Sequence, residues 1–205
     1  MLKKYFFFLF LLAALFISSA TAHAASTIQV NPNITGLNMR QGPGMDYKKL
    51  ELLAPSTKAT LLYTSTINNE KWHLIALQNG LTGWVFAEYT SPSSGTVFQP
   101  GEKIDKKITV EASSLNLRAG PDTSFTQIDR LPRGTICQAI YEKNGWLLVL
   151  LNNGKKAGWV AGWYTSANIS APAENDLPAL EKSSGGDTLI MKTAPGWDIK
   201  EVNTE

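Results

Sequence analysis

Short apolar segments alternate with turns rich in Gly, Pro and Asn from about residue 26 to residue 166, and no stretch keeps a helical period. Short segments between tight turns are typical of strands in a small barrel rather than in a sandwich. The pattern therefore predicts an all-β fold of two tandem small five-stranded barrels with a largely irregular C-terminal tail. We expect strands at 27–30, 37–40, 58–64, 72–77 and 83–86 in the first barrel, and at 108–112, 115–118, 136–142, 146–151 and 158–161 in the second.

The chain contains one pattern twice, at 37–91 and at 115–166. Each copy opens with a seven-residue motif, LNMRQGP in the first and LNLRAGP in the second. Each then reaches a Trp at the start of an apolar segment, an Asn-Gly pair, a Gly-Trp-Val and a closing Tyr-Thr-Ser. A repeat of this length indicates one folding unit built twice, and two units suit a binder that gains from two weak contacts. The Asn-Gly pairs predict hairpin turns with positive φ at both central residues.

This ordered set of motifs resembles the bacterial SH3-like domain, and the resemblance covers nearly all of residues 26–166. It implies a pair of five-stranded, partly open SH3-like barrels. It also implies a module without catalytic activity, of the kind that directs exported enzymes to peptidoglycan or mediates interactions in the envelope. Because no cluster of nucleophile, base or metal-ligand residues stands out, we expect no enzyme, no catalytic residue, no metal and no cofactor.

The N-terminal residues have the pattern of an export signal. Lys3 and Lys4 precede an apolar segment, 5–17, that is shorter than the roughly 20 residues that span a bilayer. Ala22-His23-Ala24 then fits a cleavage site. We therefore expect an exported protein, periplasmic or secreted, without stable membrane insertion after cleavage. The expected division is a signal peptide at 1–25, barrels at 26–91 and 106–166, a linker at 92–105, and a tail at 167–205 that is mostly disordered or docked.

Charge is unevenly distributed along the chain. Segment 106–166 holds eight basic and four acidic residues, whereas segment 167–205 holds three basic and seven acidic ones. A positive surface outside the cytoplasm suits anionic wall polymers, and ordinary surface charge is the alternative. The formal charge falls to zero without Lys3 and Lys4, so a nucleic-acid partner is not expected. Cys137 is the single cysteine, and its apolar neighbours predict a small buried side chain.

Aromatic residues recur at matching positions in both repeats and are the candidates for ligand binding. A Trp face is a good platform for a sugar or peptide, but Trp also fills the core of small barrels. We expect at least one of the indoles to lie in a groove, together with the aromatic residues that close each repeat. The candidate ligand-binding residues are Trp72, Trp84, Tyr89, Trp146, Trp159, Trp163 and Tyr164.

The segments that begin at Trp72 and Trp146 are apolar on both faces. Alternate strand residues point to opposite faces, so one apolar stripe in each repeat is expected to point out of its barrel. Such a stripe either packs the barrels on each other or on the tail segment 189–197, or it binds an external partner. The candidate interface residues are Leu74, Leu148 and Leu150.

The opening motifs supply candidate structural residues. Arg40 and Arg118 share one motif position, where a guanidinium can grip a carboxylate or phosphate or, alternatively, brace the following turn through backbone carbonyls. Asn side chains at such positions bond local backbone. The set is Asn38, Arg40, Gly42, Pro43, Asn116, Arg118, Gly120 and Pro121.

Two functions remain open from the sequence. The first is a non-catalytic exported protein that binds the cell envelope, through peptidoglycan or its peptide stems. The second is a periplasmic or extracellular adaptor that binds an envelope protein through exposed apolar strand faces. The partner is therefore a cell-wall glycan or peptide, or a protein of the envelope.

Overall fold

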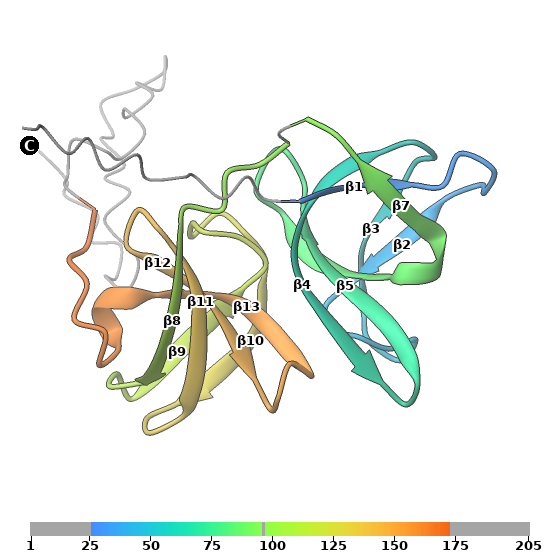
Figure 1. Cartoon of the computed structure of the whole chain (residues 1–205). Helices are drawn as coiled ribbons and strands as arrows, with labels where there is room; N and C mark the ends of the chain where they lie inside the picture. The colour runs from blue at the N-terminus through green and yellow to red at the C-terminus, as the bar shows by residue number, and fades with distance from the viewer. Residues whose placement is uncertain (1–25, 96, 173–205) are drawn as a thin grey trace, which may run out of the picture.

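The computed structural model describes residues 26–95 and 97–172, which form two β-barrels side by side (Figure 1). The first barrel contains strands β1 to β7 and the second contains β8 to β13. The predicted all-β fold of two tandem SH3-like barrels is confirmed. The expected signal peptide and residues 173–205 of the expected tail lie outside the described residues.

The first barrel is a seven-stranded antiparallel sheet with the order β3-β2-β6-β5-β4-β1-β7. A single turn of 3-10 helix, η1 (Ala87–Tyr89), follows β6. The strands are β1 (Thr27–Val30), β2 (Leu37–Arg40), β3 (Lys49–Leu53), β4 (Lys58–Ile67), β5 (Glu70–Ala76), β6 (Thr82–Phe86) and β7 (Thr90–Ser93).

The second barrel repeats this arrangement with six strands in the order β10-β9-β13-β12-β11-β8. Its 3-10 turn, η2 (Gly162–Tyr164), follows β13 at the same place as η1 follows β6. The strands are β8 (Glu102–Thr109), β9 (Ser114–Arg118), β10 (Gln127–Pro132), β11 (Ile136–Lys143), β12 (Trp146–Leu151) and β13 (Lys156–Ala161).

Each barrel has more strands than the five expected. The additional strands include β3 and β10, which pair with the motif strands β2 and β9 after the motif loop. Strands also occupy both ends of the expected linker, 92–105, since β7 pairs with β1 and β8 pairs with β11. Pairing with neighbouring strands therefore leaves a shorter connection than the Ser, Gly and Pro content suggested.

The expected positive φ at both residues of the Asn-Gly pair occurs in the second barrel and not in the first. Of Asn79 and Gly80 in the first barrel, Gly80 alone has a positive φ, +89°. The Gly80 amide donates to the Leu77 carbonyl, and the Leu77 amide donates to the Leu81 carbonyl. In the second barrel Asn152, Asn153 and Gly154 all have positive φ. The strand register explains these conformations. It leaves three residues in the loop of the first barrel and four in the loop of the second, and loops of these lengths commonly close with a residue in the left-handed conformation.

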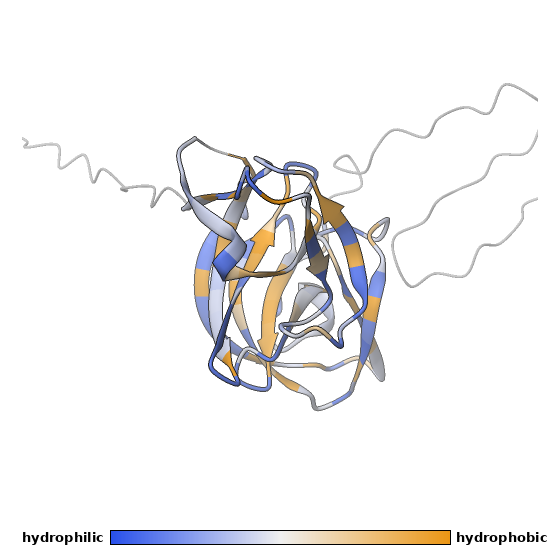
Figure 2. Cartoon of the chain, turned by 90° about the vertical axis from the view of Figure 1, so that its right-hand side faces the viewer, coloured by the Kyte–Doolittle hydropathy of each residue, from blue (hydrophilic) through white to orange (hydrophobic). Residues whose placement is uncertain are grey.

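Buried side chains form two clusters. One is the core of the first barrel and includes Met39, Ile75 and Val85. The other, here called the shared cluster, contains the second-barrel core together with Trp72, Leu74 and further residues of the first barrel. Successive residues of β5 thus alternate between the two clusters, as strand geometry requires. Figure 2 shows the apolar strands gathered within the first barrel, which faces the viewer.

Candidate functional site

Hydrogen bonds at Thr82, the first residue of β6, join the first barrel to the second. The indole Nε1 of Trp159 donates to the Thr82 hydroxyl at 3.0 Å, and this hydroxyl donates to the Gly80 carbonyl at 3.0 Å. The Thr82 amide donates to the Ala119 carbonyl at 2.6 Å. The bonds from Trp159 and to Ala119 connect the start of β6 in the first barrel with β13 and the motif loop of the second.

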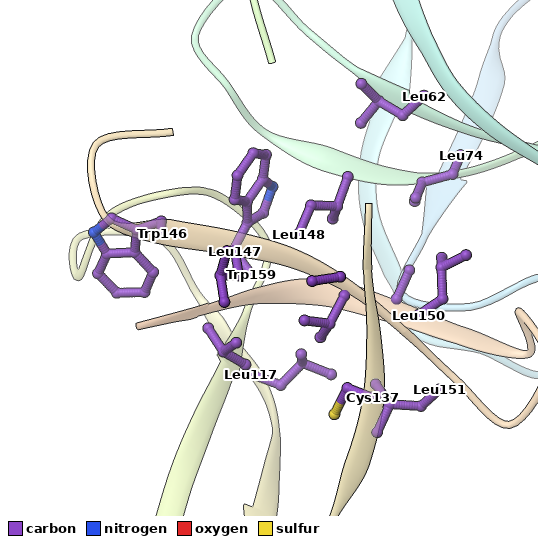
Figure 3. Packing of buried hydrophobic residues seen from close by; sticks show 14 of the residues in the cluster. Leu62, Leu74, Leu117, Cys137, Trp146, Leu147, Leu148, Leu150, Leu151 and Trp159 are labelled. Carbon is purple, nitrogen blue, oxygen red and sulfur yellow. The ribbon is translucent and has the colours of Figure 1, made fainter. Parts of the chain in front are cut away.

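The candidate interface residues lie in the contact between the barrels. Leu74 is 1% exposed and Leu148 is 0% exposed, and both belong to the shared cluster with Leu150. Figure 3 shows Leu148 and Leu150 on the side of the second barrel that faces Leu62 and Leu74. The stripes that each barrel turns outward are thus covered by the other barrel. Of the two alternatives for these stripes, the burial supports packing of the barrels on each other and opposes an external partner.

Four candidate ligand-binding indoles are buried. Trp72 and Trp146 are 1% and 5% exposed, and Trp84 and Trp159 have no exposed surface. All four belong to the shared cluster, so they fill the space within and between the barrels and offer no face to a ligand. Their expected position in a groove was wrong for that reason.

The motif arginines brace the loop that follows them. Nη1 of Arg40 donates to the Tyr47 carbonyl at 2.9 Å, and Nη1 of Arg118 donates to the carbonyls of Thr123 and Phe125 at 3.0 and 2.9 Å. Burial lowers the pKa of Arg118, and nearby Asp122 acts in the opposite direction. Bonds to backbone carbonyls favour the structural alternative over a ligand-gripping one.

The motif glycines make room for an aromatic ring. A β-carbon on Gly42 would lie 2.3 Å from the ring of Tyr47, and one on Gly120 would lie 2.4 Å from the ring of Phe125. Both rings also reach the other barrel: the Tyr47 hydroxyl donates to the Lys155 carbonyl at 3.4 Å, and Phe125 lies against Gly80. The remaining motif residues are buried or half-buried in the same loops and strands: Asn38, Pro43, Asn116 and Pro121.

An aromatic row leads from the shared cluster to the surface of the first barrel. The ring centroids of Trp72 and Phe86 are 5.4 Å apart, and those of Phe86 and Tyr89 are 5.7 Å apart. Tyr89, on η1, is 42% exposed. Of the predicted ligand-binding aromatic residues in this barrel, Tyr89 is therefore the one that a ligand can reach.

Beside this row lies an open cleft of about 470 Å³, here called the first-barrel cleft. It lies between the β4–β5 hairpin and η1, and its lining combines an aromatic ring with charges of both signs. Its residues are Asn69, Glu70, Lys71, His73, Phe86, Ala87 and Glu88. These residues were not predicted as a site. One feature could have pointed to the site: the hairpin extends past Trp72 to the Ile67–Glu70 pair, whereas the matching hairpin of the second barrel ends at Trp146.

His73 is the titratable group of the cleft with a shifted pKa. Burial is the larger cause that lowers its pKa, and the charge of Lys71 is the second. Its Nδ1 shares a hydrogen bond with the Thr64 hydroxyl at 2.9 Å. At neutral pH the imidazole is therefore neutral, and Lys71 remains the basic group of the cleft.

The second barrel has an equivalent aromatic row built from different positions. The centroids of Trp146 and Trp163 are 5.6 Å apart, and those of Trp163 and Tyr164 are 5.9 Å apart. Trp163 and Tyr164 are half-buried. Counted from Gly-Trp-Val, Phe86 is replaced by Ala161 and Glu88 by Trp163. The second barrel thus keeps the aromatic row and lacks the charge that Glu88 provides.

Cys137 is buried, and burial raises the pKa of its thiol to about 11. Across residues 26–95 and 97–172, no group of three or more His, Cys, Asp or Glu side chains is placed to hold a metal ion. In the same part of the chain, no helix has the length and apolar character that crossing a membrane requires.

Two small β-barrels, each with a repeated motif loop and a 3-10 turn before its end, define an SH3-like class. The sequence matches the family model described as Bacterial SH3 domain at residues 35–91 and again at 113–166. The chain therefore belongs to the bacterial SH3 domain family, as the motifs predicted.

Curated relatives connect this family match with cell-wall enzymes. The "Putative N-acetylmuramoyl-L-alanine amidase YrvJ" of Bacillus subtilis is 31% identical over 84% of this chain and 33% of that protein. The "Probable cell wall amidase LytH" of Staphylococcus saprophyticus is 32% identical over 34% of this chain and 26% of that protein. The chain thus spans about a third or less of the length of these relatives.

A solved structure of NlpC2 from Trichomonas vaginalis is also similar. It is 12% identical over 69% of this chain and 48% of that chain, with a TM-score of 0.28.

The relatives correct one expectation. We expected a chain that is not an enzyme, but the similar proteins carry amidase names. This chain matches one third of YrvJ, and that match alone does not show which part of YrvJ acts on a substrate. The absence of a catalytic motif in the repeats was therefore too narrow a basis for excluding hydrolysis by the whole protein.

Proposed function

We propose that the tandem barrels bind peptidoglycan in the cell envelope through the first-barrel cleft and so place a wall-amidase activity on its substrate. The observation that carries the binding proposal is the open cleft beside exposed Tyr89. Membership in the bacterial SH3 domain family and the amidase names of the relatives support the envelope as the place of action. The amidase activity is proposed for the whole protein and is not assigned to the barrels themselves.

The chemistry of the cleft suits a peptide stem that carries both carboxylates and amines. Lys71 offers a charged donor to a carboxylate, while Glu70 and Glu88 offer acceptors to an amine. The exposed face of Tyr89 lies at the end of the aromatic row, where a flat apolar ring and a hydroxyl suit a sugar or peptide unit. Mixed charge of this kind favours specificity of orientation over strong nonspecific attraction.

The expected signal peptide fits the same proposal. Export would bring the chain to the compartment in which peptidoglycan is found, and the pattern at 1–25 has the features of such a signal. We therefore propose an exported protein, periplasmic or secreted, with barrels at 26–91 and 106–166. Trp163 and Tyr164 of the second barrel are half-buried and do not line the proposed cleft.

The adaptor alternative loses its motivation. It was based on exposed apolar stripes, but Leu74, Leu148 and Leu150 are buried in the contact between the barrels. The exposed large apolar residues Met45, Leu52 and Ile136 lie on different strands or loops.

Co-sedimentation with dye-labelled purified peptidoglycan tests both parts of the proposal. We expect the folded chain to pellet with the wall at low salt and to pellet less at high salt, because exposed charges such as Lys71 are screened. Dye released into the supernatant measures hydrolysis in the same tubes. Protein that stays in the supernatant at every salt concentration contradicts the binding proposal, and bound protein without dye release contradicts the amidase proposal.

A further inference from the structure

The chain leaves its two barrels by different routes after the shared Tyr-Thr-Ser sequence. In the first barrel the chain continues as β7, and Ser91, Pro92 and Ser93 pair with β1. In the second barrel the chain turns at Asn168, which has a φ of +53°, and its amide donates to the Thr165 carbonyl at 3.1 Å. Residues 166–172 therefore do not repeat the strand that follows the first barrel.

This segment lies on the second-barrel counterpart of the first-barrel cleft. In the first barrel the cleft lies between the β4–β5 hairpin and η1. The matching elements of the second barrel are the β11–β12 turn, which contains Gly145, and η2, which contains Gly162 and Trp163. A β-carbon on Gly145 would lie 2.9 Å from the Ser170 carbonyl oxygen and 3.4 Å from Pro172. One on Gly162 would lie 3.3 Å from Ile169. The segment thus rests directly on both glycines.

The segment is held by the contacts of alternate side chains and by hydrogen bonds at its start. Ala167 and Ile169 are half-buried against the shared cluster, whereas Asn168 and Ser170 between and after them are exposed. At its start, the Ser166 amide donates to the Thr109 carbonyl at 2.9 Å, and the Thr109 amide donates to the Ser166 hydroxyl at 2.9 Å. The Lys106 ammonium donates to the Ala167 carbonyl at 3.4 Å.

The first-barrel cleft has no comparable cover from the described chain. Ala87 stands where Gly162 stands in the second barrel, Glu88 stands in place of Trp163, and the longer hairpin adds Glu70 and Lys71. The cleft remains open, with a volume of about 470 Å³. The two barrels therefore present one covered and one open version of the same surface.

We infer that residues 166–172 are an intramolecular cover of the second barrel, so that the chain presents one ligand cleft, in the first barrel. The part of this inference that concerns ligand number rests on the proposed function. The cover competes with a ligand because both need the surface of Gly145, Gly162 and Trp163. Removing the cover opens a second cleft, which lacks the charges of Glu70, Lys71 and Glu88.

Ile169→Asp in the full chain tests the cover, with Ala171→Asp as the matched control. Asp at 169 places a charge in the half-buried contact, whereas Ala171 is exposed and takes the same charge in solvent. Hydrogen exchange of residues 142–147 and 166–172 reports the cover without any ligand. We expect exchange to rise about tenfold or more in Ile169→Asp and to stay unchanged in Ala171→Asp.

A titration with a purified disaccharide tetrapeptide from peptidoglycan then counts the clefts. We expect one site per chain in the unaltered protein and in Ala171→Asp, and a second, weaker site in Ile169→Asp, because the uncovered surface lacks the charges of Glu70, Lys71 and Glu88. Unchanged exchange in Ile169→Asp, two sites in the unaltered chain, or one site in the opened variant each overturns the inference. Faster exchange without binding of the fragment to any form supports the cover and counts against the proposed function.

Discussion

The indole nitrogen of Trp159 lies 3.0 Å from the hydroxyl oxygen of Thr82, and this bond crosses from the second barrel to the first. Both residues are buried, so the bond satisfies a donor that water does not reach. The equivalent indole of the first barrel, Trp84, has no hydrogen-bond partner among the described protein atoms. The contact between the two repeats is therefore not symmetric, although the repeats share a fold.

Thr82→Val tests how far this bond stabilises the pair of barrels. The variant keeps the shape of the side chain but removes both the acceptor for Trp159 and the donor to Gly80. Leaving a buried indole N–H unpaired is expected to lower the free energy of unfolding by about 1–3 kcal/mol. Urea unfolding measures the loss, and Thr82→Ser, which keeps the hydroxyl, should lose much less. Equal losses in the two variants would show that the missing methyl, and not the bond, matters.

Leu148→Ala is expected to destabilise both barrels together. Leu148 has no exposed surface and belongs to the cluster that both barrels share. A buried Leu→Ala change costs about 2–5 kcal/mol because it leaves a cavity. Denaturant unfolding followed by fluorescence and by circular dichroism should give one transition, shifted to lower denaturant. The exposed Ile136→Ala control should shift the transition little. Two separate transitions, of which Leu148→Ala shifts one alone, would mean that the barrels fold independently.

Gly120→Ala tests the contact between the motif loop and its aromatic ring. The new β-carbon would lie 2.4 Å from the ring of Phe125, so the ring must move away from the loop and from Gly80 of the first barrel. We expect a loss of about 1–3 kcal/mol in thermal or urea unfolding. Gly44→Ala is the milder comparison, because its β-carbon would lie 3.3 Å from the ring of Tyr47. A Gly120→Ala protein as stable as Gly44→Ala would contradict this account.

His73 is expected to titrate below its ordinary pKa, for which burial is the main cause. Because the folded protein binds the proton less readily than the unfolded chain, the stability linked to His73 is fully present above about pH 6.5. That stability is lost as the pH falls through the lower folded pKa. An NMR titration should place the pKa of His73 below the ordinary value, and Lys71→Gln should raise it part of the way. A pKa that does not respond to Lys71→Gln would contradict the charge contribution.

The fold was largely predictable because the repeat fixes strand positions twice. Strand β12 has the bounds expected, Trp146–Leu151, since six apolar residues end at an Asn-rich turn. Strands β3 and β10 were missed because charged residues interrupt their apolar pattern. Bulges between Leu61 and Tyr63, and between Ala139 and Tyr141, shift the alternation of β4 and β11 in a way that residue pattern alone does not reveal.

The candidate site was less predictable, for a physical reason. A Trp such as Trp84 has the same pattern in sequence whether it faces a ligand or a second barrel, because both environments favour a large apolar surface. Its burial depends on how the two barrels pack on each other, and the repeated motifs show the fold of each barrel but not this packing. The first-barrel cleft was missed because its charged residues are ordinary polar residues of surface elements: Glu70 and Lys71 begin β5, and Glu88 lies in the 3-10 turn η1.

The most direct test of the proposed function is co-sedimentation of cleft variants with purified peptidoglycan. Lys71→Glu combined with Tyr89→Ser reverses one charge of the cleft and removes the exposed ring beside it. Lys49→Glu combined with Leu52→Ser makes the matched change on exposed residues of β3, which do not line the cleft. We expect the cleft variant to bind at least about tenfold more weakly, a loss of about 1.4 kcal/mol, and the β3 variant to bind like the unaltered chain. Equal binding of all three folded proteins would contradict the assignment of wall binding to the first-barrel cleft.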